Sequence, residues 1–297
     1  GPQTAKTFSQ EVRLASPAGN FLDYLLGVYY SNAENDRVFT RRSILCGPAV
    51  TPAPSVPTPC SSPLAAPSRF PVGVAPHGAR FENIAVFGNA TINFTQALRA
   101  LVGLRYTHDK LNVYHSRTAT GLDLNAAGQP VNTGGINPSF GPFRAGTTTD
   151  NLSGRVGLQV DVSSTSMAYA TYTRGYKGPG FNNFFNLTAV GTNFVEAETS
   201  NAFEVGLKNS LLNGRVTLNL AAFYTEFDNF QANNPDLIAG NPPTVVARFT
   251  NAGEVSTRGV EVDFAAALVR GLTITGGAAY TDAQVERFKV PVGANPA

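Results

Sequence analysis

The chain has 297 residues, enough for one large β domain or two smaller ones. Charged residues make up 14% of it, whereas ordinary soluble domains carry roughly 25%. The net charge of +2 gives no reason to expect a nucleic-acid partner. No apolar run approaches the roughly 18 residues of a transmembrane helix, so any membrane assignment rests on β-strands.

Ten segments alternate between apolar and polar residues with a period of two, which predicts β-strands. In chain order they are residues 6–15, 21–31, 80–92, 98–108, 151–162, 167–176, 198–208, 215–230, 246–268 and 272–282. The ninth is expected to bend near Gly253 or Gly259. Between the seventh and the eighth, Asn213-Gly214 is a strong signal for a tight turn.

The length of these segments indicates a membrane. Many keep their alternation for roughly ten residues, where strands of soluble proteins average about five or six. Crossing a bilayer takes about nine to eleven tilted residues. One face of each segment is apolar and the other carries charge, as a barrel with lipid outside and water inside requires.

The connections alternate between short and long along the whole chain. The long ones are residues 32–79, 110–148, 177–195 and 229–244, and a fifth is expected to begin after residue 282. This pattern predicts an all-β fold, an antiparallel up-and-down transmembrane β-barrel of which about ten strands are present, with an open curved sheet as one outcome. Aromatic residues gather near the strand ends and suggest a membrane-boundary girdle, although ordinary β propensity is an alternative. They are Tyr29, Tyr30, Tyr106, Tyr172, Tyr176 and residues 223–230.

The two cysteines, Cys46 and Cys60, flank a proline-rich stretch within residues 32–79, which we expect to be a long extracellular loop. An even pair in one polar loop predicts a disulfide and an oxidising compartment, with two free thiols as the alternative. Closing a loop of about 15 residues contributes on the order of 3 kcal/mol by the chain-entropy estimate. The spacing does not match a zinc site, and we expect no metal and no cofactor.

Several stretches resemble the middle strands of TonB-dependent outer-membrane receptors. They are residues 8–17 (FSQEVRLASP), 27–30 (GVYY), 103–107 (GLRYT), 168–182 (AYATYTRGYKGPGFN), 198–231 and 251–261. The resemblance touches nearly every predicted strand. It implies location in the bacterial outer membrane, contact with its lipid, and import of a scarce solute such as a ferric siderophore.

The chain departs from that family in several places. Neither a plug sequence nor a TonB-contacting box precedes residue 6, and the last residues lack the usual terminal aromatic strand. We therefore expect residues 1–297 to be a partial barrel domain from the middle of a receptor. Contact with the TonB complex would then depend on an N-terminal part that this sequence does not show.

Candidate ligand contacts lie in the third long segment, since aromatic side chains supply contact area in binding loops. They are Tyr176, Phe181, Asn182, Phe184 and Phe185. Loop packing or boundary anchoring is the plainer interpretation. The predicted inward rows also hold charges that line a lumen or guide a solute, and that otherwise only solvate the wall. These are Glu11, Arg13, Asp23, Arg99, Arg105, Arg155, Asp161, Glu204, Lys208, Glu261 and Asp263.

Two other functions are alternatives to import. A secreted or surface β protein that binds a ligand through its long loops has the same strand pattern. An outer-membrane hydrolase would need an acid, a base and a nucleophile at the rim, and His108-Asp109 has no nucleophile elbow to accompany it. His77 and His115 complete the histidines, and a plain polar location explains them better than metal binding does. We therefore predict a non-enzymatic receptor.

Overall fold

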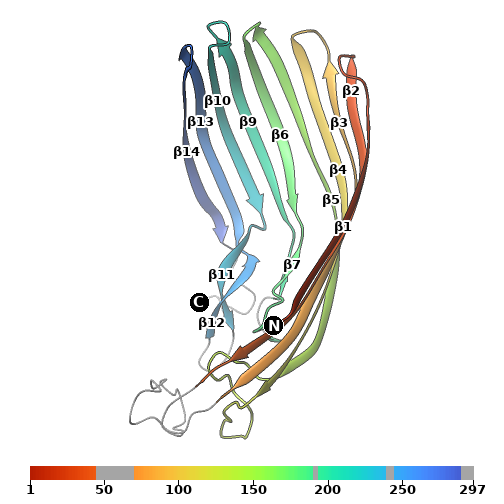
Figure 1. The fold of residues 1–297 in the computed structure, drawn as a ribbon, viewed down its shortest axis with the longest axis vertical. Coiled ribbons are helices and arrows are strands. Elements are labelled where there is room, and N and C mark those ends of the chain that lie inside the picture. The colour runs from red at the N-terminus through yellow and green to blue at the C-terminus, as the bar shows by residue number, and fades with distance from the viewer. Residues whose placement is uncertain (45–69, 190–192, 239–243, 289–297) are drawn as a thin grey trace.

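The computed structural model describes residues 1–44, 70–189, 193–238 and 244–288. Ten strands form one antiparallel sheet in the order β1-β2-β3-β4-β5-β6-β9-β10-β13-β14 (Figure 1). The sheet is a single curved layer that does not close on itself, which is one of the predicted outcomes. Its strands are β1 (Gln3–Ala15), β2 (Leu22–Arg42), β3 (Val72–Asn93), β4 (Leu98–Thr120), β5 (Phe140–Ser163), β6 (Ser166–Lys177), β9 (Glu198–Leu211), β10 (Val216–Asp228), β13 (Gly253–Val269) and β14 (Leu272–Phe288).

Strands β2 to β5 are about twice as long as predicted. Strand β2 continues to Arg42 and β3 begins at Val72, so the predicted loop over residues 32–79 is too wide at both ends. In the same way, β4 continues to Thr120 and β5 begins at Phe140 inside the predicted loop 110–148. The pair Cys46 and Cys60 lies outside the described residues, so its disulfide stays a prediction.

Two short hairpins interrupt the other long connections. Strands β7 (Gly180–Phe181) and β8 (Phe194–Val195) pair between β6 and β9, and β11 (Gln231–Ile238) pairs with β12 (Thr244–Asn251) between β10 and β13. The predicted ninth strand is therefore two strands in different sheets, divided at Gly253, where the backbone takes a φ of 120°. Residues 283–288, which were expected to begin a loop, belong to β14, since that strand extends to Phe288.

The apolar rows predicted to meet lipid are exposed on the outer face of the sheet. Leu104 is 55% exposed, Val156 48% and Val260 55%, so these side chains are not buried against a second layer. The opposite, inner face carries the charged rows, and the β6–β9 connection folds across it. Within the described residues, no helix is long and apolar enough to span a bilayer.

The outer rows change character at one level of the sheet. Tyr172, Phe203 and Tyr224 stand in register on β6, β9 and β10, and the rings of Tyr172 and Phe203 are 5.0 Å apart. On each strand, the next outward-facing residue in the direction of the long connections is polar. These residues are Arg174, Asn201 and Glu226. This arrangement fits an aromatic girdle at the edge of an apolar band.

Strand β4 shows the same boundary. Its outer row is free of charge from Leu98 to Tyr106, which is nine residues and close to one bilayer crossing. His108 follows on the same row. Tyr29 and Phe223, by contrast, alternate onto the inner face with Glu11 and Glu204, so they do not belong to the girdle.

Candidate solute-binding site on the inner face

Beyond the girdle, the inner face of the long strands is covered. On β4 the inner residues Asp109, Leu111, Val113, His115 and Arg117 are all buried. Their outer neighbours are polar, so the apolar side of the strand has changed from the outer face to the inner one. The residues that cover it belong to the connection between β6 and β9. This covered part of the sheet is where the predicted ligand contacts lie.

Arg117 of β4 holds the β6–β9 connection against the inner face of the sheet. The described residues of this connection, 178–189 and 193–197, are called the cover below, and the sheet beneath them is called the wall. The Arg117 guanidinium donates hydrogen bonds to the carbonyls of Phe185 at 2.7 Å and Leu187 at 3.0 Å. It also donates to the carbonyls of Asn137 at 3.2 Å and Pro138 at 2.8 Å. One buried cation thus joins the β4–β5 and β6–β9 connections to the strand, an arrangement that stabilises both segments.

Phe185 is packed into the wall rather than projecting into open space. It is 6% exposed and forms a cluster with Ala75 and Ile136, against which Phe39 also packs. The Arg41 guanidinium lies 4.6 Å from the centre of the Phe185 ring. Of the five predicted ligand contacts, Phe185 is therefore the one placed to anchor the segment.

Asn182 is also buried, and it joins the segment to the β11–β12 hairpin. Its Nδ2 donates to the carbonyl of Phe249 at 2.5 Å, and its Oδ1 accepts from the backbone N–H of Phe249 at 3.1 Å. The neighbouring Asn183 donates instead to the inner face of the sheet. Its Nδ2 lies 2.7 Å from the carbonyl oxygen of Gly78 and 3.2 Å from that of Tyr114.

The other three predicted contacts are half-buried. The Tyr176 hydroxyl donates to Oδ2 of Asp109 at 2.9 Å, and Asp109 also accepts from Nδ2 of Asn83. The ring of Phe181 lies 5.2 Å from that of Phe194, and Phe184 lies 6.0 Å from the Arg248 guanidinium. The structure therefore gathers the five residues along one segment, with Tyr176 and Phe185 turned to the wall and Asn182 to the hairpin.

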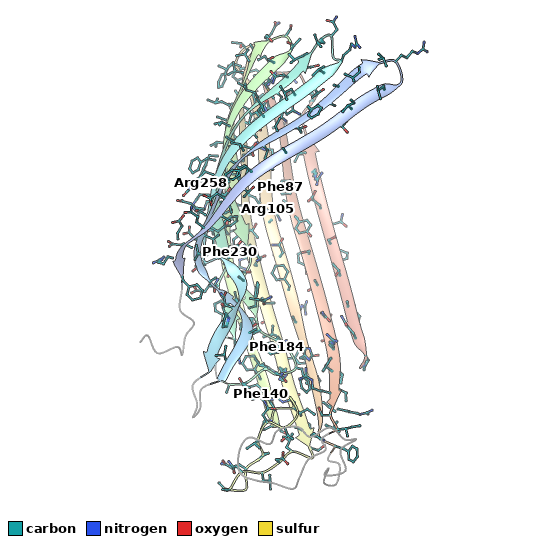
Figure 2. All side chains as sticks on the ribbon, turned by 90° about the vertical axis from the view of Figure 1, so that its left-hand side faces the viewer. Phe87, Arg105, Phe140, Phe184, Phe230 and Arg258 are labelled. Atoms are coloured by element: carbon teal, nitrogen blue, oxygen red, sulfur yellow. The ribbon has the colours of Figure 1, made fainter. Side chains whose placement is uncertain are left out.

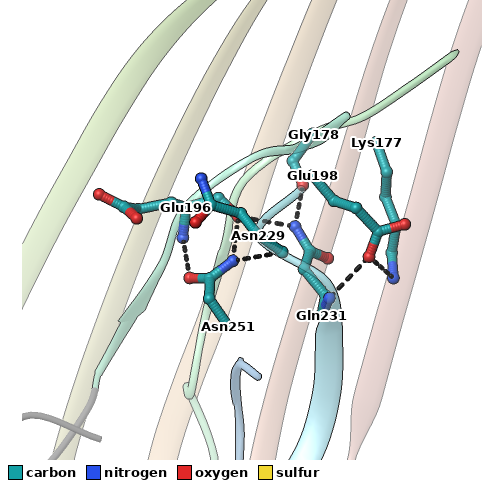
Figure 3. A network of polar contacts seen from close by, with 7 residues as sticks. All are labelled: Lys177, Gly178, Glu196, Glu198, Asn229, Gln231 and Asn251. Carbon is teal, nitrogen blue, oxygen red and sulfur yellow. Dashed lines mark hydrogen bonds and ion pairs between the residues drawn. The ribbon is translucent and has the colours of Figure 1, made fainter. Parts of the chain in front are cut away.

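A polar network holds the hairpin to this segment (Figure 3). The buried carboxylate of Glu198 accepts the backbone N–H of Gln231 at 2.6 Å and lies 3.8 Å from Nζ of Lys177. The Gln231 side chain donates to two carbonyls, those of Gly178 and Glu196, each at 2.9 Å.

Asn251 completes the network from β12. Its Nδ2 donates to the carbonyls of Glu196 at 3.0 Å and Asn229 at 2.8 Å, and its Oδ1 accepts the backbone N–H of Glu196 at 2.8 Å. Almost all of these bonds satisfy backbone groups. The side chains Glu198, Gln231 and Asn251 therefore fix the shape of the cover, and none of them was predicted, since no local pattern marks them.

His108 lies on one face of the sheet, and His77 and His115 lie on the other, with their rings 5.9 Å apart. His108 is on the outer face, with its Nδ1 2.7 Å from Oδ1 of Asp150. His115 is on the inner face and is 1% exposed. Burial, followed by the neighbouring charges of Arg117 and His77, lowers the pKa of His115 to about 4, so the ring is neutral at pH 7. The described residues contain no cluster of three or more His, Cys, Asp or Glu that is arranged to hold a metal.

An open antiparallel sheet in chain order, with an apolar outer band, an aromatic edge and a polar inner face, is the wall of an outer-membrane-type β-barrel. Comparison with known families agrees. Residues 4–296 match the family described as "TonB dependent receptor-like, beta-barrel", and the chain belongs to it. The family and its solved members are β-barrels of the outer membrane, which confirms the predicted location.

Curated relatives include the Metal-pseudopaline receptor CntO of Pseudomonas aeruginosa, 24% identical over 66% of this chain and 23% of the relative. The Ferric-pyoverdine 358 receptor of Pseudomonas putida is 23% identical over 42% of this chain and 14% of the relative. Matched regions thus span about a quarter or less of these receptors.

Two solved structures have the same fold. The ferric yersiniabactin uptake receptor FyuA from Yersinia pestis aligns with a TM-score of 0.66 and 18% identity, over 95% of this chain and 36% of FyuA. The Ferric-Catecholate import receptor Fiu from E. coli K12 aligns with a TM-score of 0.65 and 16% identity, over 97% of this chain and 39% of Fiu.

Proposed function

We propose that this chain is part of the barrel wall of a transporter that imports a metal or siderophore complex across the outer membrane in a TonB-dependent manner. The observation that carries the proposal is the charge-free outer band of β4, bounded by aromatic residues, combined with the family match over residues 4–296. Receptors for metal–pseudopaline and ferric pyoverdine among the relatives support a chelated metal as the solute.

The half-buried aromatic residues of the cover are the proposed solute contacts. Phe181, Phe184 and Tyr176 keep part of their surface accessible, whereas Asn182 and Phe185 are buried and hold the segment in place. Aromatic faces of this kind supply contact area at little conformational cost. Import without chemical conversion of the solute fits relatives that are named as receptors.

The test is uptake in cells starved of iron. A strain that lacks the gene for this protein should accumulate less radioactive iron from at least one ferric siderophore in a panel, and the restored gene should return uptake to its original level. Uptake should also vanish in a strain without TonB, while entry of a small antibiotic through general porins is unchanged. Unchanged accumulation for every chelate would contradict the proposal.

Fractionation separates this proposal from a secreted ligand-binding protein. The outer band requires lipid or detergent, so the protein should stay in the outer-membrane fraction after a carbonate wash. A protein recovered from the medium, monodisperse without detergent, would support the secreted alternative instead.

A further inference from the structure

Two arginine side chains on the inner face, at the level of the apolar outer band, form no ion pair with a carboxylate among the described residues. They are Arg105 of β4 and Arg155 of β5 (Arg105 is labelled in Figure 2). Nε of Arg105 donates to Oγ1 of Thr107 at 3.1 Å. Its guanidinium carbon lies 5.5 Å from the centre of the Tyr29 ring and 5.6 Å from that of Phe87.

The two arginines project from neighbouring strands. In the β4–β5 register Arg155 stands opposite Gly103, and Arg105 stands opposite Ser153, so both are on the same face and one inner position apart. The Asn89 side chain lies over Gly103, with its Oδ1 2.6 Å from where a Cβ would stand. A shallow hollow of about 340 Å³ lies beside Arg155, and Asp23 and Asn89 also line it.

Two other inner-face arginines at this level are paired with carboxylates. Arg99, six residues before Arg105 on β4, has its Nη2 2.6 Å from Oδ1 of Asp161. Arg13 of β1 contacts the carboxylate of Glu11. Asp23, the acid nearest to Arg155 in the hollow, already accepts hydrogen bonds from the backbone of Asn20 and the side chain of Asn93.

We propose that Arg105 and Arg155 form an anion-binding site on the inner face. Its ligand would be a metal chelate that carries carboxylate groups. The guanidinium fork matches a carboxylate in two parallel hydrogen bonds, and aromatic faces hold the fork in a fixed plane. Arg105 directly precedes Tyr106 of the girdle. It lies two inner positions from the buried Asp109, in the direction of the short turns. A solute that passes the cover would therefore meet Arg105 next.

This inference depends on the proposed function for its physiological meaning, but its test does not need transport. The probe is citrate, a carboxylate anion, added to the purified protein in detergent. Phenylglyoxal labels accessible arginines, and mass spectrometry then reports the labelling at each position. Citrate should protect Arg105 and Arg155, while an equal ionic strength of chloride should not, and Arg99 should be unaffected by either.

Substitutions give the second measurement. The double variant Arg105→Gln and Arg155→Gln should bind citrate about tenfold more weakly or worse, because charge-assisted hydrogen bonds are lost. Arg105→Lys should recover only part of that loss, since it keeps the charge and lacks the fork. The matched control Arg99→Gln removes an inner-face arginine that is already paired, and it should leave citrate binding unchanged.

Three results would overturn the proposed anion-binding site: no protection by citrate, equal protection of Arg99, or arginines that react with phenylglyoxal only after denaturation. The last would show that a protein segment covers them. If citrate binds as expected but deleting the gene leaves uptake of every ferric chelate unchanged, the proposed function fails and the anion site stands.

Discussion

His108 and Asp109 follow one another on β4 and point to opposite faces of the sheet. The His108 ring bonds to Asp150 on the outer face, at the edge of the aromatic girdle that lies toward the long connections. Asp109 is 2% exposed on the inner face, where it accepts the Tyr176 hydroxyl. The sequence offers no nucleophile to accompany this adjacent acid and base, and the pleat of the strand also separates their side chains.

The outer band predicts a depth-dependent cost for charge. Val102 lies in the middle of the charge-free row of β4, so Val102→Arg should lower the free energy of unfolding by about 2–4 kcal/mol. Asn112→Arg is the control, because Asn112 is on the same row but beyond the girdle toward the long connections. It should change the free energy of unfolding little. The measurement is chemical unfolding in lipid vesicles. Equal losses in both variants would show that the row does not face hydrocarbon.

Gly206 has a packing role that its position in β9 does not reveal. A Cβ added there would come 2.5 Å from the ring of Tyr169 on β6, so the ring lies directly over the glycine. Gly206→Ala should therefore destabilise the sheet by about 1–3 kcal/mol through overpacking. Gly277→Ala is the matched control in β14, where the nearest atom would be 3.4 Å away. If the two variants unfold alike, the ring is not held over Gly206.

Arg117 should hold the cover in place. Arg117→Gln removes several hydrogen bonds to buried carbonyls, at a cost of about 1–3 kcal/mol for groups left unsatisfied. Hydrogen exchange at residues 182–188 should become faster, while exchange in the girdle region stays slow. Arg144→Gln, on the outer face of β5, is the control. Unchanged protection at residues 182–188 would contradict the anchoring role.

The buried His115 predicts a loss of stability in acid. Its folded pKa of about 4 lies below the ordinary value of 6.5, so the unfolded chain binds the proton first as the pH falls. The contribution is fully present above pH 6.5 and disappears as the pH falls toward 4, by at most about 3 kcal/mol. His115→Asn should remove this part of the pH dependence in unfolding measurements. A variant with the same acid profile as the parent would exclude His115 as its source.

The strand order and the direction of the apolar rows could be predicted from the sequence, because hydrocarbon outside and water inside impose a simple alternation. Strand lengths could not. Past Tyr106 the outer residues Lys110 and Asn112 are polar and the inner Leu111 and Val113 are apolar, so the alternation continues with its faces exchanged. A search for apolar outer rows stops at that exchange.

The candidate site was predictable only in part. Aromatic residues in a loop indicated where to look, but the packing of Phe185 against Ile136 joins segments about fifty residues apart, and no local pattern specifies it. The same holds for Arg117, which reads as an ordinary polar strand residue until its four carbonyl partners are in place. Long-range burial decides which side chains anchor the cover and which remain accessible.

The extra length of β2 to β5 places part of these strands outside the membrane, where they can be reached from the medium. From His108 to Thr120 strand β4 continues for about 40 Å beyond the girdle at the usual rise per residue. Its outer side chains there, including Lys110 and Asn112, face away from the lumen. An antibody against this extension of β4 should therefore bind living bacteria whose outer membrane is intact.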